Sequence, residues 1–392
     1  MNKSLRSESL QKLPPYLFVE IDKKKRAKIA AGADVINLGV GDPDRPTMPF
    51  IVEAMARAIH NSRYHQYPSV VGNIAFRKSA ARFMKKRFGV EADPETQILT
   101  VVGSKEGIFH LPLATVNPGE TIIIPDPGYP VYNAGATFAR ADICKIPLTE
   151  QNNWLPDLAS LPAETVNNAR LMWANYPGNP TAAVAPLSFY QEWAEFCRAN
   201  DIIAASDNAY SEVYFDEPQP SLWQADSADI NTMYGIEFHS CSKTFNMTGW
   251  RVGFAVGHAE VISALASVKG NADSGAFEAV QEAAKTAFDN YDHPQVREMV
   301  EVYRRRRDIF CEGLQKLGWD VPKPAASFFV WGKCPGNMDS WEFANRCLEE
   351  ADIVLVPGAG LSEHTRGYFR AAMTVEEEKM REAVQRLASI KW

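Results

Sequence analysis

Short apolar runs alternate with amphipathic stretches between about residues 95 and 290, and this alternation restricts the fold more than any other feature. Alternating strands and helices predict a mostly parallel sheet with helices on both faces, an α/β fold. Two intervening stretches, Lys105–Val116 and Leu187–Asn200, have the periodicity of amphipathic helices. The runs expected to form buried strands are Ile98–Val102, Thr121–Pro125, Arg170–Ala174, Ile202–Ser206, Ile236–Ser240 and Val252–Val256.

A chain of 392 residues is longer than one hydrophobic core usually serves, so we expect a large and a small domain. Residues 41–292 are predicted to form the large domain and residues 293–392 a small C-terminal α+β domain, with the N-terminal segment 1–40 packing against the small one. A charged amphipathic stretch, His293–Gly318, predicts a helix that leaves the large domain. The small domain is expected to hold strands at Ser327–Trp331, Ile353–Val356 and Tyr368–Ala371, and helices near Ser340–Glu350 and from Val375.

Composition and spacing argue against several classes of protein. The formal net charge of −7 argues against a nucleic-acid partner, which needs a basic face. No apolar stretch approaches the roughly 18 residues of a membrane helix, and the N-terminus lacks the apolar core of a secretory signal, so we expect no membrane partner and a cytoplasmic location. The six cysteines form no CxxC pair, as is typical of reduced cytosolic thiols, and the seven histidines show no metal-ligand spacing.

The most specific local string is Ser240-Cys-Ser-Lys-Thr-Phe-Asn-Met-Thr-Gly-Trp-Arg251, a polar turn that follows a predicted buried strand. A lysine that forms a Schiff base needs surroundings that lower its pKa, and a nearby cation contributes to that. Arg251 also suits a phosphate, which arginine binds bidentately. The string therefore indicates Lys243 as a Schiff-base lysine; the alternative is a surface loop with unrelated basic residues.

Two further strings follow predicted strands, where parallel sheets bind their ligands. Asp207 ends one strand, and an aspartate there can keep a pyridine nitrogen protonated. Tyr210, one helical turn later, could donate to a phenolic oxygen; alternatively, Asp207 is only a helix N-cap. In Asn175-Tyr-Pro-Gly-Asn-Pro-Thr181 a rigid turn would present Asn179 to the cleft, or would be a turn with no further role.

Three weaker strings complete the set. Gly103-Ser-Lys-Glu-Gly107 lies between a strand and a helix, so its backbone amides and the Ser104 hydroxyl could bind an anion, or could belong to an ordinary capped helix start. Tyr129, in Pro125-Asp-Pro-Gly-Tyr-Pro-Val-Tyr132, could stack on a flat ring or serve only in packing. Leu38-Gly-Val-Gly41 lacks the third glycine of a dinucleotide fingerprint, which excludes a nicotinamide site.

Taken in order, these strings resemble the fold-type-I aminotransferases over nearly the whole chain. The resemblance implies an aspartate-aminotransferase-like fold with a seven-stranded sheet, and pyridoxal phosphate as cofactor. It implies that Lys243 is the Schiff-base lysine and the proton-transfer base, that Asp207 pairs with the pyridine nitrogen, and that Tyr129 stacks on the ring. Tyr210 and Asn179 would contact the phenolic oxygen. The residues expected around the phosphate are Gly103, Ser104, Lys105, Ser240, Ser242 and Arg251.

The same resemblance implies the partners. Arg370, in the string Tyr-Phe-Arg, is similar to the arginine that binds the α-carboxylate of small-molecule amino-acid and 2-oxo-acid substrates. Tyr67, just before Pro68, is similar to a tyrosine that the neighbouring subunit lends to the phosphate, which implies a homodimer with shared active sites. The candidate substrate-binding residues are Val40, Gly41, Lys105, Asn179 and Arg370.

Within the family, the strings GSKEGI, PDPGYPVY, EFHSCSKTFNMTGWRVGFAVG and NADSGAF are most similar to bacterial-type LL-diaminopimelate aminotransferases. This likeness implies ping-pong transfer of an amino group from LL-diaminopimelate to 2-oxoglutarate, a step of lysine biosynthesis. Val70 and Val71 depart from the pattern, because many relatives carry an aromatic or acidic residue just before Gly72. An apolar pair there would suit alanine or a longer apolar amino acid, so aminotransferases for alanine, aspartate, methionine or aromatic amino acids stay open as alternatives.

Two rival functions use the same fold. A C–S lyase or a decarboxylase would need the same cofactor-binding residues, and a requirement for an amino acceptor would separate these enzymes from an aminotransferase. A regulatory ligand sensor would carry a DNA-binding segment ahead of this domain. Because the family-like region begins by about Pro14, the sequence leaves no room for a helix-turn-helix module.

Overall fold

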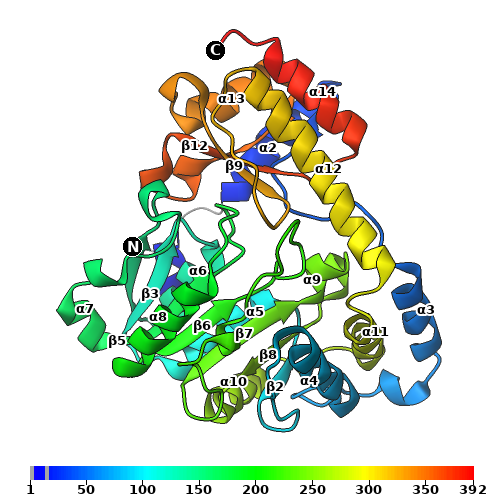
Figure 1. Cartoon of the computed structure of the whole chain (residues 1–392), viewed down its shortest axis with the longest axis vertical. Helices are drawn as coiled ribbons and strands as arrows, with labels where there is room; N and C mark the ends of the chain where they lie inside the picture. The colour runs from blue at the N-terminus through cyan, green and yellow to red at the C-terminus, as the bar shows by residue number, and fades with distance from the viewer. Residues whose placement is uncertain (1–3, 14–16) are drawn as a thin grey trace.

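The structure is a computed structural model that describes residues 4–13 and 17–392, with side chains described in 4–13 and 22–392. Its centre is a seven-stranded sheet in the order β2-β8-β7-β6-β5-β3-β4, which confirms the predicted fold class (Figure 1). β8 runs antiparallel to both neighbours, and the other strand pairs of this sheet are parallel. The strands are β2 (Ile98–Val101), β3 (Thr121–Asp126), β4 (Asp142–Pro147), β5 (Ala169–Asn175), β6 (Ile203–Asp207), β7 (Gly235–Ser240) and β8 (Gly253–Gly257).

All six predicted strands are present, with ends that differ by at most one residue from the apolar runs. β4 was not predicted, because it lies at the edge of the sheet beside β3 and only Ile146 of its six residues is buried. An edge strand with one buried side chain has no long apolar run, so its sequence resembles that of a polar loop.

Helices cover both faces of the sheet. Side chains from α5, α6 and α10 form one buried cluster, and side chains from α4, α8 and α11 belong to the cluster on the other face. Two helix ends have residues typical of their positions: α6 starts with Pro130, and Gly89, with a left-handed φ of 73°, caps the end of α4. The helices of this layer are α3 (Pro49–Ala58), α4 (Ile74–Phe88), α5 (Ser104–Thr115), α6 (Pro130–Ala139), α7 (Ala163–Asn168), α8 (Leu187–Ala199), α9 (Cys241–Thr244), α10 (Ala259–Ala272) and α11 (Glu278–Asp289).

The predicted long helix is α12 (Pro294–Lys316), which runs from the sheet layer to a smaller α+β unit (Figure 1). That unit contains an antiparallel sheet in the order β11-β12-β9. Arg306, from the basic run on α12, is buried against Asp44 rather than exposed on the helix surface. The elements of the unit are β9 (Phe329–Lys333), α13 (Ser340–Ala351), β10 (Ile353–Val354), β11 (Val356–Pro357), β12 (Tyr368–Ala372) and α14 (Glu377–Ala388).

The N-terminal segment contacts both units. α2 (Leu17–Ala30) lies beside the small unit, where Lys28 forms an ion pair with Asp352 at 2.9 Å, and β1 (Ile36–Asn37) pairs with β10. The shorter α1 (Glu8–Lys12) packs against α6 instead. The domain division at residues 40 and 292 stays a prediction, part of whose first segment (1–3 and 14–16) lies outside the described residues.

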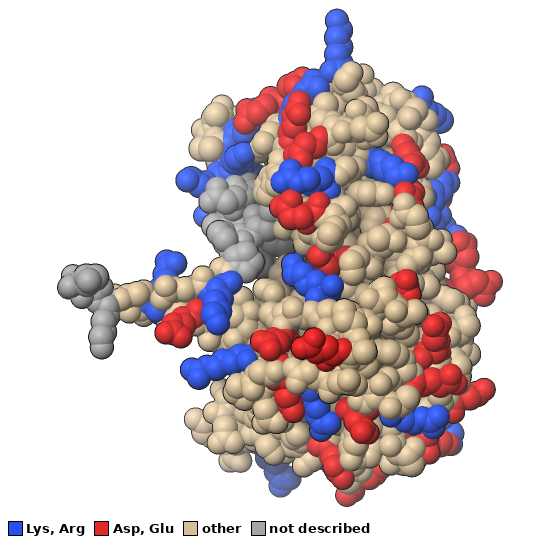
Figure 2. Space-filling view, turned by 90° about the vertical axis from the view of Figure 1, so that its left-hand side faces the viewer, with Lys and Arg blue, Asp and Glu red and all other residues tan. Residues whose placement is uncertain are grey.

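Acidic and basic side chains are intermixed on the face that Figure 2 shows, with no large area of one sign. Many charged side chains of the described residues form exposed ion pairs; Lys333, for example, pairs with Asp320 at 2.7 Å and with Glu150 at 2.9 Å. Among the described helices, none combines the length and the apolar character that crossing a bilayer would require.

Candidate active site

A cavity of about 580 Å³ lies at the carboxyl ends of the parallel strands, next to the small unit. This is the edge at which α/β sheets bind ligands. All of the predicted site residues except Gly103 and Tyr67 line this cavity. Residues far apart in the sequence, from Val40 to Arg370, are therefore brought together by the fold.

Lys243 lies on α9, directly after β7, and its partly buried side chain belongs to the cavity wall. Its Nζ donates a hydrogen bond to the carbonyl oxygen of Gly41 at 2.7 Å. The pKa of Lys243 is lowered to about 8, mainly by burial; the charge of Asp42 opposes this shift, and the charges of Arg251 and Arg370 contribute to it. An amine with such a pKa has a substantial neutral fraction near neutral pH, as a nucleophile or a general base requires.

Asp207 is the last residue of β6 and is 5% exposed. The hydroxyl of Tyr132 donates to Oδ2 at 2.7 Å. Oδ1 is buried near the amide of Ala209, but no described group makes a well-formed hydrogen bond to it. Burial raises the pKa of Asp207 to about 6, against the hydrogen bond from Tyr132. The carboxylate thus offers an acceptor for a buried N–H donor.

The end of β5 supports this carboxylate and leads to Asn179. Asn175 lies opposite Asp207 in the sheet register, and its Nδ2 donates to the backbone oxygen of Asp207 at 2.8 Å. The Oδ1 of Asn175 accepts from the amide of Asn179 at 2.8 Å. One amide side chain therefore fixes both the aspartate strand and the predicted turn.

Arg370 enters the cavity from β12 of the small unit and is 3% exposed. Its Nη1 donates to Oδ1 of Asn179 at 2.9 Å, and its Nη2 donates to the carbonyl oxygen of Gly39 at 2.6 Å. The guanidinium lies 4.4 Å from the ring centroid of Phe329. Because Asn179 belongs to the sheet layer, this arginine joins the two units of the chain across the cavity.

The segment that carries Val40 and Gly41 is held along its length. Thr374 Oγ1 donates to the carbonyl oxygen of Val40 at 3.0 Å. Further on, Arg306 forms a bidentate contact with Asp44, at 2.7 and 2.8 Å. These contacts fix the backbone that lies beside Lys243 and Arg370.

The predicted anion site is formed by the start of α5 and by Arg251. Ser104 is the first residue of a 12-residue helix, so its backbone amide belongs to the helix N-terminus. Gly103 has φ +72°, and a Cβ there would lie 2.3 Å from Nη2 of Arg251. Only glycine therefore permits this approach of the guanidinium. Gly103 lies beside the cavity without lining it.

Tyr129, Lys105 and Tyr210 form part of the remaining wall. The Nζ of Lys105 lies 5.9 Å from the ring centroid of Tyr129, and the Tyr129 ring packs edge-on against Tyr132. Burial raises the pKa of Tyr210, and the Asp207 charge adds to the effect, so this phenol stays protonated as a hydrogen-bond donor.

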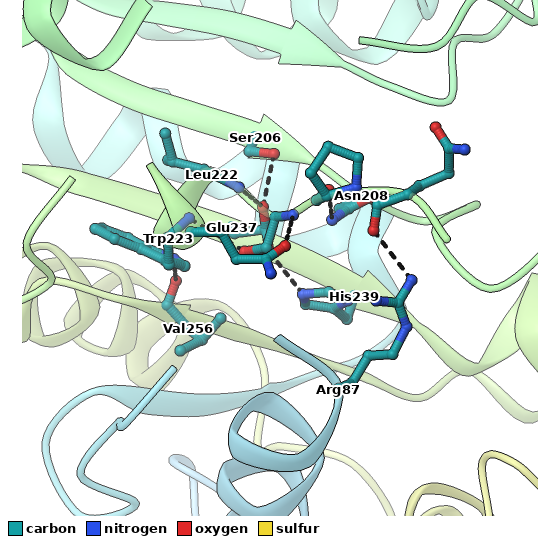
Figure 3. Close-up of polar contacts among 12 residues, drawn as sticks. Arg87, Ser206, Asn208, Leu222, Trp223, Glu237, His239 and Val256 are labelled. Atoms are coloured by element: carbon teal, nitrogen blue, oxygen red, sulfur yellow. Dashed lines mark hydrogen bonds and ion pairs between the residues drawn. The ribbon is translucent and has the colours of Figure 1, made fainter. Parts of the chain in front are cut away.

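A buried polar cluster lies next to the strand ends (Figure 3). Glu237 on β7 accepts hydrogen bonds from His239 at 2.8 Å, Ser221 at 2.7 Å, Ser206 at 3.1 Å and the amide of Leu222 at 2.9 Å. Burial alone would raise the pKa of Glu237, but these hydrogen bonds outweigh it and lower the pKa. Ser206 directly precedes Asp207, so the cluster holds the strand that presents the aspartate.

Sequence reasoning missed several residues of the site. Asn175, Asp42, Thr248 and Phe329 line the cavity, and Tyr132 contacts Asp207 from outside the lining. A signal for two of them was present: Asn175 directly follows a predicted strand, and Thr248 lies within the Ser240–Arg251 string. No local pattern indicated the positions of Asp42, Phe329 and Tyr132.

Tyr67, Val70 and Val71 do not line the cavity of their own chain, and neither does Ser274 of the Asn271–Phe277 string NADSGAF. The side chain of Tyr67 is 90% exposed. Val71 is partly buried, and its carbonyl oxygen accepts from the amide of Thr100 at 3.1 Å. The loop is thus anchored to the sheet while its tyrosine points into solvent.

Comparison with known proteins gives a consistent result. The family of aminotransferases of class I and II matches residues 33–387. The LL-diaminopimelate aminotransferase of Aquifex aeolicus is 48% identical over 387 residues, which cover 98% of this chain and 99% of the relative. The enzyme of the same name from Nitratidesulfovibrio vulgaris is 46% identical over 388 residues, 98% of each chain.

Solved structures agree on the fold. Substrate-bound BacF from Bacillus subtilis superposes with a TM-score of 0.93 at 34% identity, over 98% of both chains. A mutant aspartate aminotransferase from Thermus thermophilus superposes with a TM-score of 0.90 at 27% identity, over 98% of this chain and 99% of that one. With the family match, the relatives and the site geometry in agreement, the chain belongs to the class I and II aminotransferases.

Proposed function

We propose that pyridoxal phosphate, the cofactor that membership of this family implies, binds in the site cavity and is attached to Lys243. The observation that carries the proposal is the wall around this lysine. An amine of lowered pKa, a buried carboxylate with an open acceptor and a helix N-terminus beside an arginine all face one cavity of about 580 Å³.

The side chains fit this group. A protonated ring nitrogen would supply the donor that Oδ1 of Asp207 lacks. A phosphate would meet the start of α5 and the guanidinium of Arg251. Tyr129 would pack on the ring, and Tyr210 and Asn179 would donate to its phenolic oxygen. The hydroxyls available to the phosphate are those of Ser104, Ser240 and Ser242.

When bound, the cofactor supplies an electron-withdrawing ring that accepts the electron pair left on the substrate Cα. The chain does the rest. Asp207 keeps the ring nitrogen protonated, and Arg370 binds the α-carboxylate of the substrate and orients its Cα. The Nζ of Lys243, freed from the cofactor by the substrate amine, would remove the Cα proton and deliver it to the cofactor carbon that is bonded to the substrate nitrogen.

For the substrates we propose LL-diaminopimelate as amino donor and 2-oxoglutarate as acceptor, within lysine biosynthesis. The names of relatives at 46–48% identity support this choice. Both substrates carry an α-carboxylate for Arg370, so discrimination depends on the distal end. Lys105, in the cavity wall, is the candidate for a distal carboxylate. Ser274 or its neighbours are the candidates for the distal ammonium, although Ser274 does not line the cavity of its own chain.

The test is a comparison of kcat/KM for diaminopimelate, alanine, aspartate, methionine and an aromatic amino acid with 2-oxoglutarate. A site that satisfies a buried polar group rejects analogues lacking it by about 10⁴-fold or more. We expect diaminopimelate to exceed the others. A higher value for any of them would overturn the substrate while leaving the reaction class intact, and turnover without an amino acceptor would favour a lyase.

We also propose a cytoplasmic homodimer in which Tyr67 reaches the phosphate of the partner's site. The exposure of its side chain and its absence from its own cavity support this assignment, and six unpaired cysteines suit a reducing compartment. Mixing an inactive Lys243→Ala protein with a crippled Tyr67→Phe protein should restore one intact site per mixed dimer. No recovery after verified subunit exchange would mean that Tyr67 serves its own chain.

A further inference from the structure

Outside the cavity, the end of α10 holds a fully buried lysine. The side chain of Lys269 is 0% exposed, and its Nζ lies 2.8 Å from Oε2 of Glu106 and 3.1 Å from Oδ2 of Asp273. A buried ammonium needs such partners, because an unpaired charge in the interior is very unfavourable. Glu106, on α5, belongs to the predicted anion-binding string, whereas Asp273 caps the last turn of α10.

Glu106 contacts the backbone of the turn that leads into α5. Its Oε2 accepts a hydrogen bond from the amide of Val102 at 2.9 Å, while Nη2 of Arg251 donates to the carbonyl oxygen of Val102 at 3.3 Å. Val102 is therefore held at both of its backbone polar groups. The next residue, Gly103, caps α5, and the first two residues of that helix, Ser104 and Lys105, line the cavity.

Asp273 contacts the backbone of a second loop, which follows α10 and contains Gly275. Its Oδ1 accepts a hydrogen bond from the amide of Gly275 at 2.8 Å. Gly275 has φ +86°, and a Cβ there would lie 2.8 Å from the carbonyl oxygen of Ser69. This loop thus packs closely against the backbone that carries Tyr67. The ammonium of Lys269 joins the two loops through one carboxylate on each.

The same group of side chains could be taken for a metal site, because ligand atoms of Glu106, His110 and Asp273 lie within 4.8 Å of one another. The ammonium of Lys269 already supplies the positive charge between the two carboxylates. His110 completes the group, with Nδ1 2.6 Å from Oε1 of Glu106. The cluster is therefore a satisfied charge network rather than a cation site.

We propose that Lys269 is a positioning residue for the cofactor phosphate. Its ammonium fixes Glu106, Glu106 fixes the backbone of Val102, and that backbone sets the direction of the amides at the start of α5. The inference rests on the proposed binding of pyridoxal phosphate in the cavity. By this proposal, the affinity for the cofactor phosphate depends on Lys269, whose side chain does not line the cavity.

The test compares two ligands on the purified full-length apo-protein, by absorbance titration. Pyridoxal phosphate uses the phosphate site, whereas pyridoxal lacks the phosphate but keeps the aldehyde and the ring nitrogen. For Lys269→Met we expect pyridoxal phosphate to bind about tenfold more weakly or worse, because breaking a buried pair shifts the groups it held. Pyridoxal should bind within about twofold of the unsubstituted protein, because its contacts do not include the turn.

Arg87→Met is the matched control. Arg87 is shown in Figure 3, and it pairs with the buried Glu212 at 3.0 Å away from the cavity lining. The Arg87→Met substitution should lower the melting temperature without changing the ratio of the affinities for pyridoxal phosphate and pyridoxal. If Lys269→Met does not yield folded protein, Glu106→Gln provides the same test, because Lys269 keeps Asp273 as its partner.

The outcomes separate the two proposals. If the unsubstituted protein does not bind pyridoxal phosphate, the proposed cofactor is wrong. If it binds, and the folded variants at positions 269 or 106 weaken both ligands equally or neither of them, the role of Lys269 is overturned. Weakening confined to pyridoxal phosphate supports it.

Discussion

The two ends of the cavity are constructed differently. The proposed phosphate end comes from one unit of the chain: the start of α5, the turn after β7 and Arg251 all belong to the sheet layer. The proposed carboxylate end needs both units, since Arg370 on β12 contacts Asn179 at 2.9 Å across the cavity. A cofactor held by one unit would depend on that unit alone, whereas a substrate held between the two units would depend on their relative position. Variants at the two ends should therefore separate cofactor affinity from substrate affinity.

Lys243→Ala should give the largest effect, because this residue lies between the two ends and serves both. We expect kcat to fall by more than about 10⁴-fold, since both the attachment point and the proton-transfer base are lost. Borohydride reduction of the unsubstituted holoenzyme and peptide mapping should place the label on Lys243. A label on Lys105 or Lys269 would contradict the assignment.

Asp207→Asn should rank second. A neutral amide does not hold a ring nitrogen protonated, so kcat should fall by about a hundredfold or more while the protein still folds. The Asp207→Asn substitution should also change the absorbance of the bound cofactor. Tyr132→Phe is a milder control, because it removes only the hydrogen bond to Oδ2. Near-normal kcat in Asp207→Asn would exclude the proposed role.

Arg251→Lys and Arg370→Lys test the comparison directly. Each change replaces a bidentate guanidinium by a point charge, which we expect to weaken binding by about tenfold. Arg251→Lys should raise the dissociation constant of pyridoxal phosphate and leave the substrate KM nearly unchanged. Arg370→Lys should raise the KM of both the amino acid and the 2-oxo acid without changing cofactor affinity. Equal effects of both variants on both quantities would mean that the two ends are not independent.

The pH dependence of cofactor capture should give the smallest effect. Burial lowers the pKa of Lys243 to about 8, and only the neutral amine attacks an aldehyde. The rate at which the apo-protein captures pyridoxal phosphate should rise about tenfold per pH unit below this pKa and level off above it. An inflection near the ordinary lysine value of about 10.4 would show that burial has little effect. The reaction of pyridoxal phosphate with Nα-acetyl-lysine, which keeps a free ε-amino group, is the control for titration of the cofactor itself.

The large sheet could be predicted from the sequence because its strands are buried on both faces and read as apolar runs. β4 could not, since Ile146 is its only buried residue. The small unit was predicted in outline, but Ile353–Val356 was expected as one strand and forms two, β10 and β11, which pair with different partners.

The site was predictable where a motif follows a strand, as at Asp207, Asn179 and Lys243. It was not predictable where a residue acts from a surface that only the fold creates. The hydroxyl of Tyr132 reaches Asp207 across 75 positions of sequence. Lys269 meets Glu106 across 163 positions, and nothing in its neighbourhood of α10 distinguishes it from a surface lysine. Contacts of this kind depend on helix packing, which local patterns do not encode.

The open acceptor on Asp207 has a consequence for the protein in the cell. A buried polar atom without a partner costs about 1–3 kcal/mol, and no described residue makes a well-formed hydrogen bond to this oxygen. A ligand that fills it stabilises the native state in proportion to the logarithm of its free concentration. The coenzyme should then act as a chaperone during biogenesis, and the steady-state abundance of the enzyme should follow coenzyme supply even when transcription is constant.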